Sequence, residues 1–227
     1  MEKKVRIDNQ DNSKIRKSNL PKTRKEDIRK PRQYFLIVCE GEKTEPNYFK
    51  SFKKFLPPNM MIIHGEGRNT LSLIDEAEKL FKDYNFSGNI IDEIWVVFDR
   101  DSFNADNFDN AIHRANNLRF HCAYSNEAFE LWYILHFEYK QNAASRDDYK
   151  SILTKYLNFD YKKNDPGMYY NLKDTGNQEQ AIKWAKKLLR DHNSKNIPPS
   201  KANPCTTVFA LVERLNEFIE IKQINDF

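Results

Sequence analysis

The sequence lacks the features of a secreted, membrane-spanning or zinc-binding protein. It has three cysteines, Cys39, Cys122 and Cys205, an odd number without the spacing of a disulfide framework or a zinc site. No apolar run approaches the roughly 20 residues that span a bilayer, and the first residues contain no apolar signal-peptide core. We therefore expect a cytoplasmic protein without a membrane partner, in which Cys39 and Cys122 are buried thiols within apolar runs.

Several catalytic and cofactor-binding motifs are also absent. The chain contains no P-loop, no dinucleotide-binding glycine motif, no G-x-S-x-G nucleophile turn and no H-E-x-x-H zinc motif. His121 and His136 have no second ligand at metal-site spacing and are expected to belong to a strand and to the core. These absences argue against a P-loop ATPase, a serine hydrolase of the α/β type and a zinc peptidase.

Positive charge is concentrated at the start of the chain, although the net charge is only +4. Residues 1–32 contain twelve basic and five acidic residues and no aromatic residue, whereas the remainder contains 25 basic and 28 acidic residues. A basic arm of this kind attracts polyanions, above all nucleic acid. Composition alone leaves open the alternative of a solvated tail without a partner.

The rest of the chain alternates between predicted strands and helices and then becomes mostly helical. Continuous apolar runs predict four strands, at 34–39, 60–63, 91–98 and 121–124. Helical periodicity predicts helices at 44–54, 70–84, 106–118, 127–137, 145–157, 177–192 and 206–222. The stretches 156–176 and 196–204 are predicted to be loops, and "NPCTT" at 203–207 a loop with Thr206 or Thr207 capping the last helix.

This order of elements predicts an α/β fold. Strand–helix alternation is typical of a parallel sheet with helices on both faces. We expect a basic flexible arm at 1–32, a core with a mostly parallel four-stranded sheet at 33–125, and a helical part packed on it at 126–227. Thr44 is expected to cap its helix, and Ser145 with Asp148 to form a near capping box.

Carboxylates follow two of the predicted strands. Glu40 ends the first strand and is followed by Gly41, which allows a tight turn, and Asp99 and Asp101 follow the third strand. In an open parallel sheet, ligands gather beyond the carboxyl ends of the strands, and residues i and i+2 of an extended segment point to one side. Clustered carboxylates repel one another, and Mg2+ or Mn2+ relieves that repulsion. Glu40, Asp99 and Asp101 are therefore a candidate metal site for phosphodiester cleavage.

Each of these acidic elements is weak when taken alone, because a lone D-x-D is usually a solvated turn. Their order within an alternating α/β stretch is more specific. The strings "YFLIVCEGEKTEPNYF", "VVFDRDSF", "YSNEAFELWYILHF" and "NPCTTVFALVERL" together resemble the RloB-like family, over about residues 33–215. The Glu-Gly and D-x-D pattern is similar to the Toprim fold of topoisomerases, primases and OLD-type nucleases.

This resemblance implies a Toprim-like catalytic core with a metal site. Glu40 matches the Toprim glutamate, a metal ligand or general base, and Asp99 and Asp101 match the metal-binding pair. Glu45 is similar to the second acid of OLD-like motifs, so the resemblance allows for a second metal. Glu130 in "AFELW" matches the family's F-E position and is a candidate further ligand. Where the family has S-N-P, Glu127 replaces the proline, so a less rigid turn and an extra carboxylate are expected there.

A second group of residues is a candidate for nucleic-acid binding. Basic residues hold phosphates and aromatic residues stack on unpaired bases, which points to Lys43, Arg68, Lys162, Lys163, Tyr169, Tyr170 and Lys173. Ordinary roles compete with this interpretation. Lys43 is at least as well explained by pairing with Glu42 or Glu45, and Arg68 by an ordinary loop. The tyrosine-rich stretch is equally well explained by a loop that packs on the sheet.

The sequence thus supports one main hypothesis and one rival. The main hypothesis is an Mg2+- or Mn2+-dependent nuclease in prokaryotic anti-phage defence, which the resemblance associates with an AAA-type ATPase partner encoded nearby. The rival is a non-catalytic Toprim-like module that binds nucleic acid or the ATPase. A primase- or topoisomerase-like enzyme has less support, because no tyrosine or extra domain of the needed kind is identifiable. DNA or RNA, one metal or two, and the oligomeric state stay open.

Overall fold

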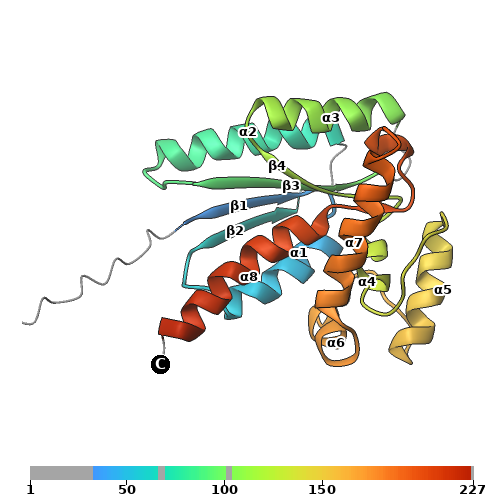
Figure 1. Cartoon of the computed structure of the whole chain (residues 1–227). Coiled ribbons are helices and arrows are strands. Elements are labelled where there is room, and N and C mark those ends of the chain that lie inside the picture. The colour runs from blue at the N-terminus through green and yellow to red at the C-terminus, as the bar shows by residue number, and fades with distance from the viewer. Residues whose placement is uncertain (1–32, 66–69, 101–103, 226–227) are drawn as a thin grey trace, which may run out of the picture. The chain divides into compact units, whose positions relative to one another are not determined.

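The computed structural model describes residues 33–65, 70–100 and 104–225. Figure 1 shows how the helices and strands of this part of the chain are arranged. In chain order they are β1 (Phe35–Cys39), α1 (Thr44–Lys50), the 3-10 helix η1 (Ser51–Lys54), β2 (Met61–Gly65), α2 (Thr70–Phe86), β3 (Glu93–Asp99), α3 (Ala105–Asn117), β4 (His121–Asn126), α4 (Glu130–Ile134), α5 (Arg146–Leu157), α6 (Met168–Thr175), α7 (Gln178–Asn193), the 3-10 helix η2 (Pro199–Lys201), β5 (Cys205–Thr206) and α8 (Val208–Asn225).

The described strands form a five-stranded sheet in the order β2-β1-β3-β4-β5. Strands β1 to β4 are parallel, and β5 runs antiparallel to β4. The predicted α/β class and the mostly parallel sheet are confirmed. The predicted number of four strands is wrong, because Cys205–Thr206, expected to be part of a loop, pairs with Ser125 and Asn126. A two-residue strand has no periodicity to detect.

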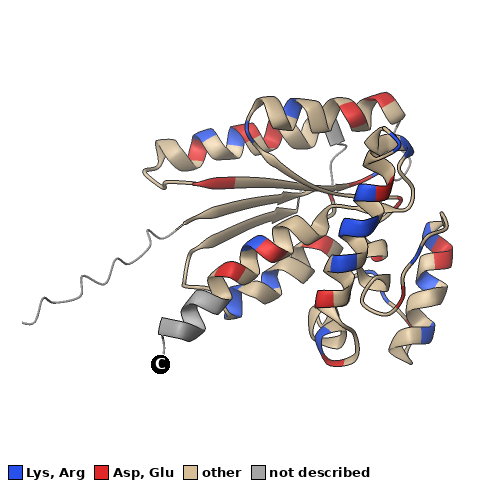
Figure 2. Ribbon diagram, in the orientation of Figure 1, with Lys and Arg blue, Asp and Glu red and all other residues tan. Residues whose placement is uncertain are grey.

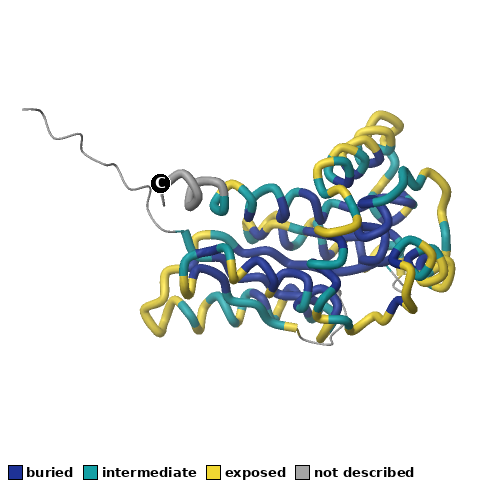
Figure 3. The backbone as a smooth tube through the Cα atoms, turned by 90° about the horizontal axis from the view of Figure 1, so that it is seen from below, coloured by how far each residue is buried: buried dark blue, intermediate teal, exposed yellow. Residues whose placement is uncertain are grey.

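Helices cover both faces of the sheet. Successive residues of its central strands point to opposite faces, and the residues on each face are apolar. Leu36 and Val38 of β1 point into a core that α2 and α3 share, and Phe35 and Ile37 point into a second core on the other face. Helices α2 and α3 lie above the sheet in Figure 1, and α1 and α8 lie below it. The strands are the buried centre of this three-layer arrangement (Figure 3).

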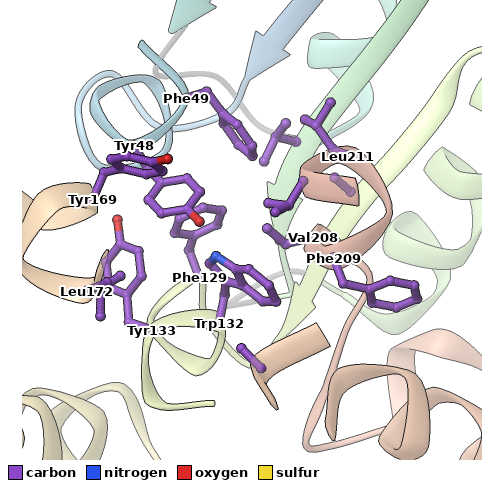
Figure 4. Packing of buried hydrophobic residues seen from close by; sticks show 14 of the residues in the cluster. Tyr48, Phe49, Phe129, Trp132, Tyr133, Tyr169, Leu172, Val208, Phe209 and Leu211 are labelled. Atoms are coloured by element: carbon purple, nitrogen blue, oxygen red, sulfur yellow. The ribbon is translucent and has the colours of Figure 1, made fainter. Parts of the chain in front are cut away.

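The C-terminal helices extend the second core instead of forming a core of their own. An aromatic cluster joins α1 to α4 and α6, with ring centroids of Tyr48 and Tyr133 5.7 Å apart and those of Tyr48 and Tyr169 5.6 Å apart. Edge-to-face and tilted aromatic packing of this kind stabilises a core beyond the area that it buries. Figure 4 shows the side chains of Tyr48, Tyr133 and Tyr169 converging between the helices. Helices α4 to α7 lie beyond the carboxyl ends of the strands (Figure 1).

Local expectations were confirmed in some places and wrong in others. Ser145 and Asp148 form a full capping box at the start of α5. Thr44 does not cap α1, because it lies in the helix and its hydroxyl donates to the carbonyl oxygen of Lys163, 2.7 Å away. The predicted loop at 156–176 contains helix α6, and the predicted helix at 127–137 is helical only over Glu130–Ile134.

None of the helices in the described ranges combines the length and the apolar composition needed to cross a bilayer. This finding agrees with the absence of long apolar runs in the sequence.

Candidate functional site

The connections of the sheet place two acidic residues side by side. From β1 the chain crosses to β2 on one side and then returns to β3 on the other, so the direction of winding switches between β1 and β3. Crevices at such switch points are the usual ligand sites of open α/β sheets. Glu40 directly follows β1, and Asp99 is the last residue of β3. The backbone N–H of Asp99 donates to Oε2 of Glu40 at 3.1 Å.

Glu45 joins these two residues from the first turn of α1. Its carboxylate lies directly against the backbone of Gly41, where a Cβ atom would come within 2.9 Å of Glu45 Cδ and 3.0 Å of Oε1. Gly65, at the end of β2, also provides room, because a Cβ atom there would lie 2.8 Å from the carbonyl oxygen of Gly41. The two glycines therefore allow the loop after β1 to bring Glu45 back over the end of the sheet.

Glu130 is the fourth acid and comes from the first turn of α4. The hydroxyl of Tyr161 donates to Glu130 Oε1 at 3.0 Å, which fixes one carboxylate oxygen. Glu40, Glu45, Asp99 and Glu130 are called the acid cluster below. The side chains of the last three are almost fully buried, with 4%, 6% and 2% of their residue surfaces exposed.

Burial makes the ionised cluster costly. Desolvation raises the pKa of Asp99 well above its usual value, and the charges of Glu45 and Glu130 raise it further. Desolvation likewise raises the pKa of Glu45, again helped by Glu130. Among the described residues, Glu45 Oε2, Asp99 Oδ1 and Glu130 Oε2 are buried and have no hydrogen-bond partner. Buried carboxylate oxygens normally have partners, so these three orphaned atoms are unusual for a folded interior.

Basic residues surround the acid cluster. A guanidinium nitrogen of Arg146, the first residue of α5, lies 3.6 Å from Asp99 Oδ2. Arg146 and Lys163 both lower the pKa of Glu45, against the effect of burial. Lys162 and Lys163 line a pocket together with Arg146 and Lys150, and buried Glu130 lines the same pocket. The sequence prediction included the two consecutive lysines but missed Arg146 and Lys150, because only the tertiary fold brings α5 over the ends of the strands.

The residues predicted to bind nucleic acid differ in how far they are exposed. Lys43 is exposed, as are Lys162, Lys163 and Lys173. Tyr169 packs in the aromatic core and is 7% exposed, so little of its ring remains for stacking on a base. Tyr170 is half-buried, with the ammonium group of Lys54 over its ring. Arg68 lies outside the described residues.

Glu42 and Glu127 stand apart from the buried members of the site. Glu42 is exposed, and Glu127 is half-buried, with a charge that raises the pKa of Tyr149 as do those of Glu130 and Asp99. Asp101, the third residue of the predicted metal site, lies outside the described residues. Of the sequence-predicted acids, the structure therefore brings Glu40, Glu45 and Asp99 together with Glu130.

The chemistry of the acid cluster fits a divalent cation. Carboxylate oxygens are the ligands that Mg2+ and Mn2+ prefer, and three of them here are buried without a partner. Within the described ranges, no three acidic, histidine or cysteine side chains are already arranged to hold an ion. The donors therefore fit in kind, and their side chains would have to converge further on binding.

Comparison with known protein families identifies the family of this chain. The model of the RloB-like protein family matches residues 35–215. The chain belongs to the RloB-like family. A search of curated proteins and a search of solved structures each found no significant match.

The RloB-like match covers the whole candidate site. It begins at the first residue of β1 and ends within α8, so it includes all four residues of the acid cluster. It also includes Arg146 and Tyr161, which sequence reasoning did not assign to the metal site. The basic segment at 1–32 lies outside the matched region.

Proposed function

We propose that this RloB-like protein is a metal-dependent nuclease with a Toprim-like active site. The observation that carries the proposal is the acid cluster itself: three buried carboxylates, each with an orphaned oxygen, at the switch point of a mostly parallel sheet. Such a cluster is costly in an apolar interior unless it binds a cation. The basic residues around it add the complementary charge that a phosphate-containing substrate requires.

Each acid has a distinct place in this proposal. Asp99, Glu45 and Glu130 would hold Mg2+ or Mn2+ through their unpartnered oxygens, and Asp101 remains a further candidate. Glu40 is less buried, and one of its oxygens is engaged with the backbone of Asp99. At the edge of the buried acids, Glu40 is the candidate for accepting a proton from the attacking water. Tyr161 would position Glu130 through its hydrogen bond to Oε1.

The cations of the chain would hold the substrate. Arg146 and Lys163 act electrostatically on the acids, so they would hold phosphate groups of the substrate beside the metal site. When bound, the metal ion would supply an activated water and a Lewis acid for the leaving oxygen. Lys43 and the basic segment at 1–32 are proposed to hold more distant phosphates.

A cleavage assay tests this proposal. The protein is incubated with Mn2+ and with single-stranded DNA, duplex DNA, RNA and tRNA, and Asp99→Asn is compared with the exposed control Asp83→Asn on α2. We expect Asp99→Asn to reduce cleavage by more than about 100-fold, because it removes a proposed ligand, and the control to leave it unchanged. If the protein cleaves none of the four substrates, either alone or together with a partner ATPase, the proposed nuclease activity is refuted.

The contact between Arg146 and Asp99 supports a second candidate function. If Arg146 neutralises the acids permanently, the site is a structural charge network in a non-catalytic module that binds nucleic acid or an ATPase. Calorimetric titration with Mn2+ separates the two proposals. Binding that Glu130→Gln abolishes supports the nuclease, whereas no binding by the unmodified protein supports the module.

The cellular setting remains a proposal that rests on the family resemblance. We propose a role in prokaryotic anti-phage defence, in the cytoplasm, with an AAA-type ATPase encoded nearby as partner. Loss of phage protection on replacing Asp99 by Asn, but not Asp83, would support this role.

A further inference from the structure

The pocket beside the acid cluster has an acidic floor and a basic rim. Its volume is about 370 Å³, and it is lined by Glu130, Arg146, Asp147, Lys150, Tyr161, Lys162 and Lys163. Glu130 and Tyr161 are buried, whereas Lys150, Lys162 and Lys163 are exposed. Two separate segments supply the cations: the first turns of α5 and the chain between α5 and α6. Figure 2 shows basic positions on α5 and on the connection to α6.

Two features place this pocket next to the acid cluster. Glu130 belongs to both, and Arg146 lines the pocket while it also lies 3.6 Å from Asp99. The connection between α5 and α6 is fixed against α1, because Thr44 donates to the carbonyl oxygen of Lys163 and the Asn47 side-chain amide donates to that of Asn164. The lysines of this connection are therefore held beside α1, which carries Glu45.

The charge of the pocket exceeds what an internal phosphodiester needs. Four cationic side chains face two acidic ones, which leaves a formal excess of two positive charges. An internal phosphodiester carries one negative charge, whereas a phosphomonoester carries about 1.5 to 2 negative charges at neutral pH. The pocket therefore matches a terminal phosphate better than a phosphate within the chain.

The size of the pocket is compatible with a terminal phosphate. Its volume is near the lower end of the roughly 300–1,000 Å³ that small-molecule sites occupy. That is room for a single phosphate-bearing group, and a base-paired duplex end would bring a second strand against the same rim. An unpaired terminus is the form of nucleic acid that suits this space.

We propose that this pocket binds the terminal phosphomonoester of a single-stranded nucleic acid and so places the adjacent phosphodiester bonds over the acid cluster. This inference rests on the proposed nuclease function and names its substrate class, a strand with a phosphorylated end. The end recognised is either the 5′ or the 3′ end, since both present the same group.

Binding of labelled oligonucleotides tests the proposal. One single-stranded sequence is prepared with a 5′-phosphate, with a 3′-phosphate and with hydroxyl groups at both ends, and dissociation constants are measured in Ca2+ at fixed salt. We expect one phosphorylated form to bind at least about tenfold more tightly than the hydroxyl form, because the charge-assisted hydrogen bonds to the end are lost in the latter. The form that binds tightly identifies the end. Equal binding of all three overturns the proposal.

A pair of lysines on the same helix provides the matched control. Lys150 lines the pocket, whereas Lys155 is exposed on α5 and does not. We expect Lys150→Gln to reduce the preference for the phosphorylated end by about threefold or more, and Lys155→Gln to leave it unchanged. If Lys150→Gln weakens all three oligonucleotides equally, the pocket binds backbone phosphates only and the proposal fails.

The failure of this proposal is distinguishable from failure of the nuclease function. Cleavage in Mn2+ without an end preference in binding retains the nuclease and rejects the end pocket. An end preference without cleavage of any substrate retains the pocket and rejects the nuclease.

Discussion

The replacement of Gly41 by alanine tests whether a glycine positions the acid cluster. An alanine Cβ would lie 2.9 Å from Glu45 Cδ and 3.0 Å from Oε1, and closer still to Oε2. The backbone at Gly41 is not in the left-handed region, so alanine itself is allowed there. The variant therefore acts through the Glu45 carboxylate, which is buried and has to move.

Two opposing contributions set the magnitude. Alanine in place of glycine stabilises a protein by about 0.4–1 kcal/mol, because it restricts the unfolded chain. Crowding a packed interior costs about 1–3 kcal/mol. We therefore expect Gly41→Ala to lower the free energy of unfolding by about 1–2 kcal/mol, measured by urea denaturation. If Glu45 binds metal, the displaced carboxylate also lowers Mn2+ affinity by about tenfold or more.

A double-mutant cycle with Glu45→Ala tests whether crowding of the Glu45 carboxylate causes the destabilisation by Gly41→Ala. Once the Glu45 carboxylate is removed, the crowding disappears and only the restriction of the unfolded chain remains. The effect of Gly41→Ala should then change sign, to a stabilisation of about 0.4–1 kcal/mol. If Gly41→Ala is equally destabilising in the presence and in the absence of the Glu45 side chain, the close approach of Gly41 and Glu45 is not its cause.

Three further variants test individual contacts. Tyr161→Phe removes the hydrogen bond to buried Glu130 and should lower the free energy of unfolding by about 1–2 kcal/mol, measured by urea denaturation. The control Tyr156→Phe removes a hydrogen bond to a half-buried glutamate and should lower it clearly less. Burial lowers the pKa of His136 to about 4, so its contribution to stability is present above pH 6.5 and is lost as the pH falls toward 4. His136→Asn should reduce the loss of unfolding free energy between pH 6.5 and pH 4, by about 3 kcal/mol at most. An unchanged pH dependence of the unfolding free energy would show that His136 does not cause that loss. Gly65→Ala places a Cβ 2.8 Å from a backbone oxygen and should destabilise by about 3 kcal/mol; a neutral effect would contradict the close approach.

The central strands were predictable because they are buried on both faces. Continuous apolar runs mark β1 and β3, which are buried along almost their whole length. Their neighbours β2 and β4 are less completely buried, and their predicted boundaries differ from the observed ones by up to two residues. Two of the acids, Glu40 and Asp99, were predictable for the same reason. Once the strands are parallel and adjacent, the residues at their carboxyl ends must meet at one edge of the sheet.

The helical part was less predictable because tertiary packing decides its structure. Tyr169 belongs to a stretch that reads as a polar, tyrosine-rich loop, yet it lies on α6 and packs against Phe52 of η1. Thr44 is a residue type that often caps helices, but its hydroxyl donates to the carbonyl oxygen of Lys163, 119 residues further along the chain. Neither partner is visible from local sequence, so propensity gave the wrong answer at both positions.

The position of Arg146 bears on whether the acid cluster is a binding site or a structural network. A guanidinium group that neutralised a buried carboxylate permanently would be expected to form short, paired hydrogen bonds of about 2.7–2.9 Å with both oxygens. Arg146 and Asp99 form an ion pair at 3.6 Å, and the other oxygen of Asp99 is among the buried atoms without a partner in the described part of the chain. One guanidinium group also cannot satisfy the orphaned oxygens of Glu45 and Glu130 as well. A divalent cation is the smaller group that can meet several carboxylates at once, and Arg146 would then be placed to contact a phosphate bound beside it.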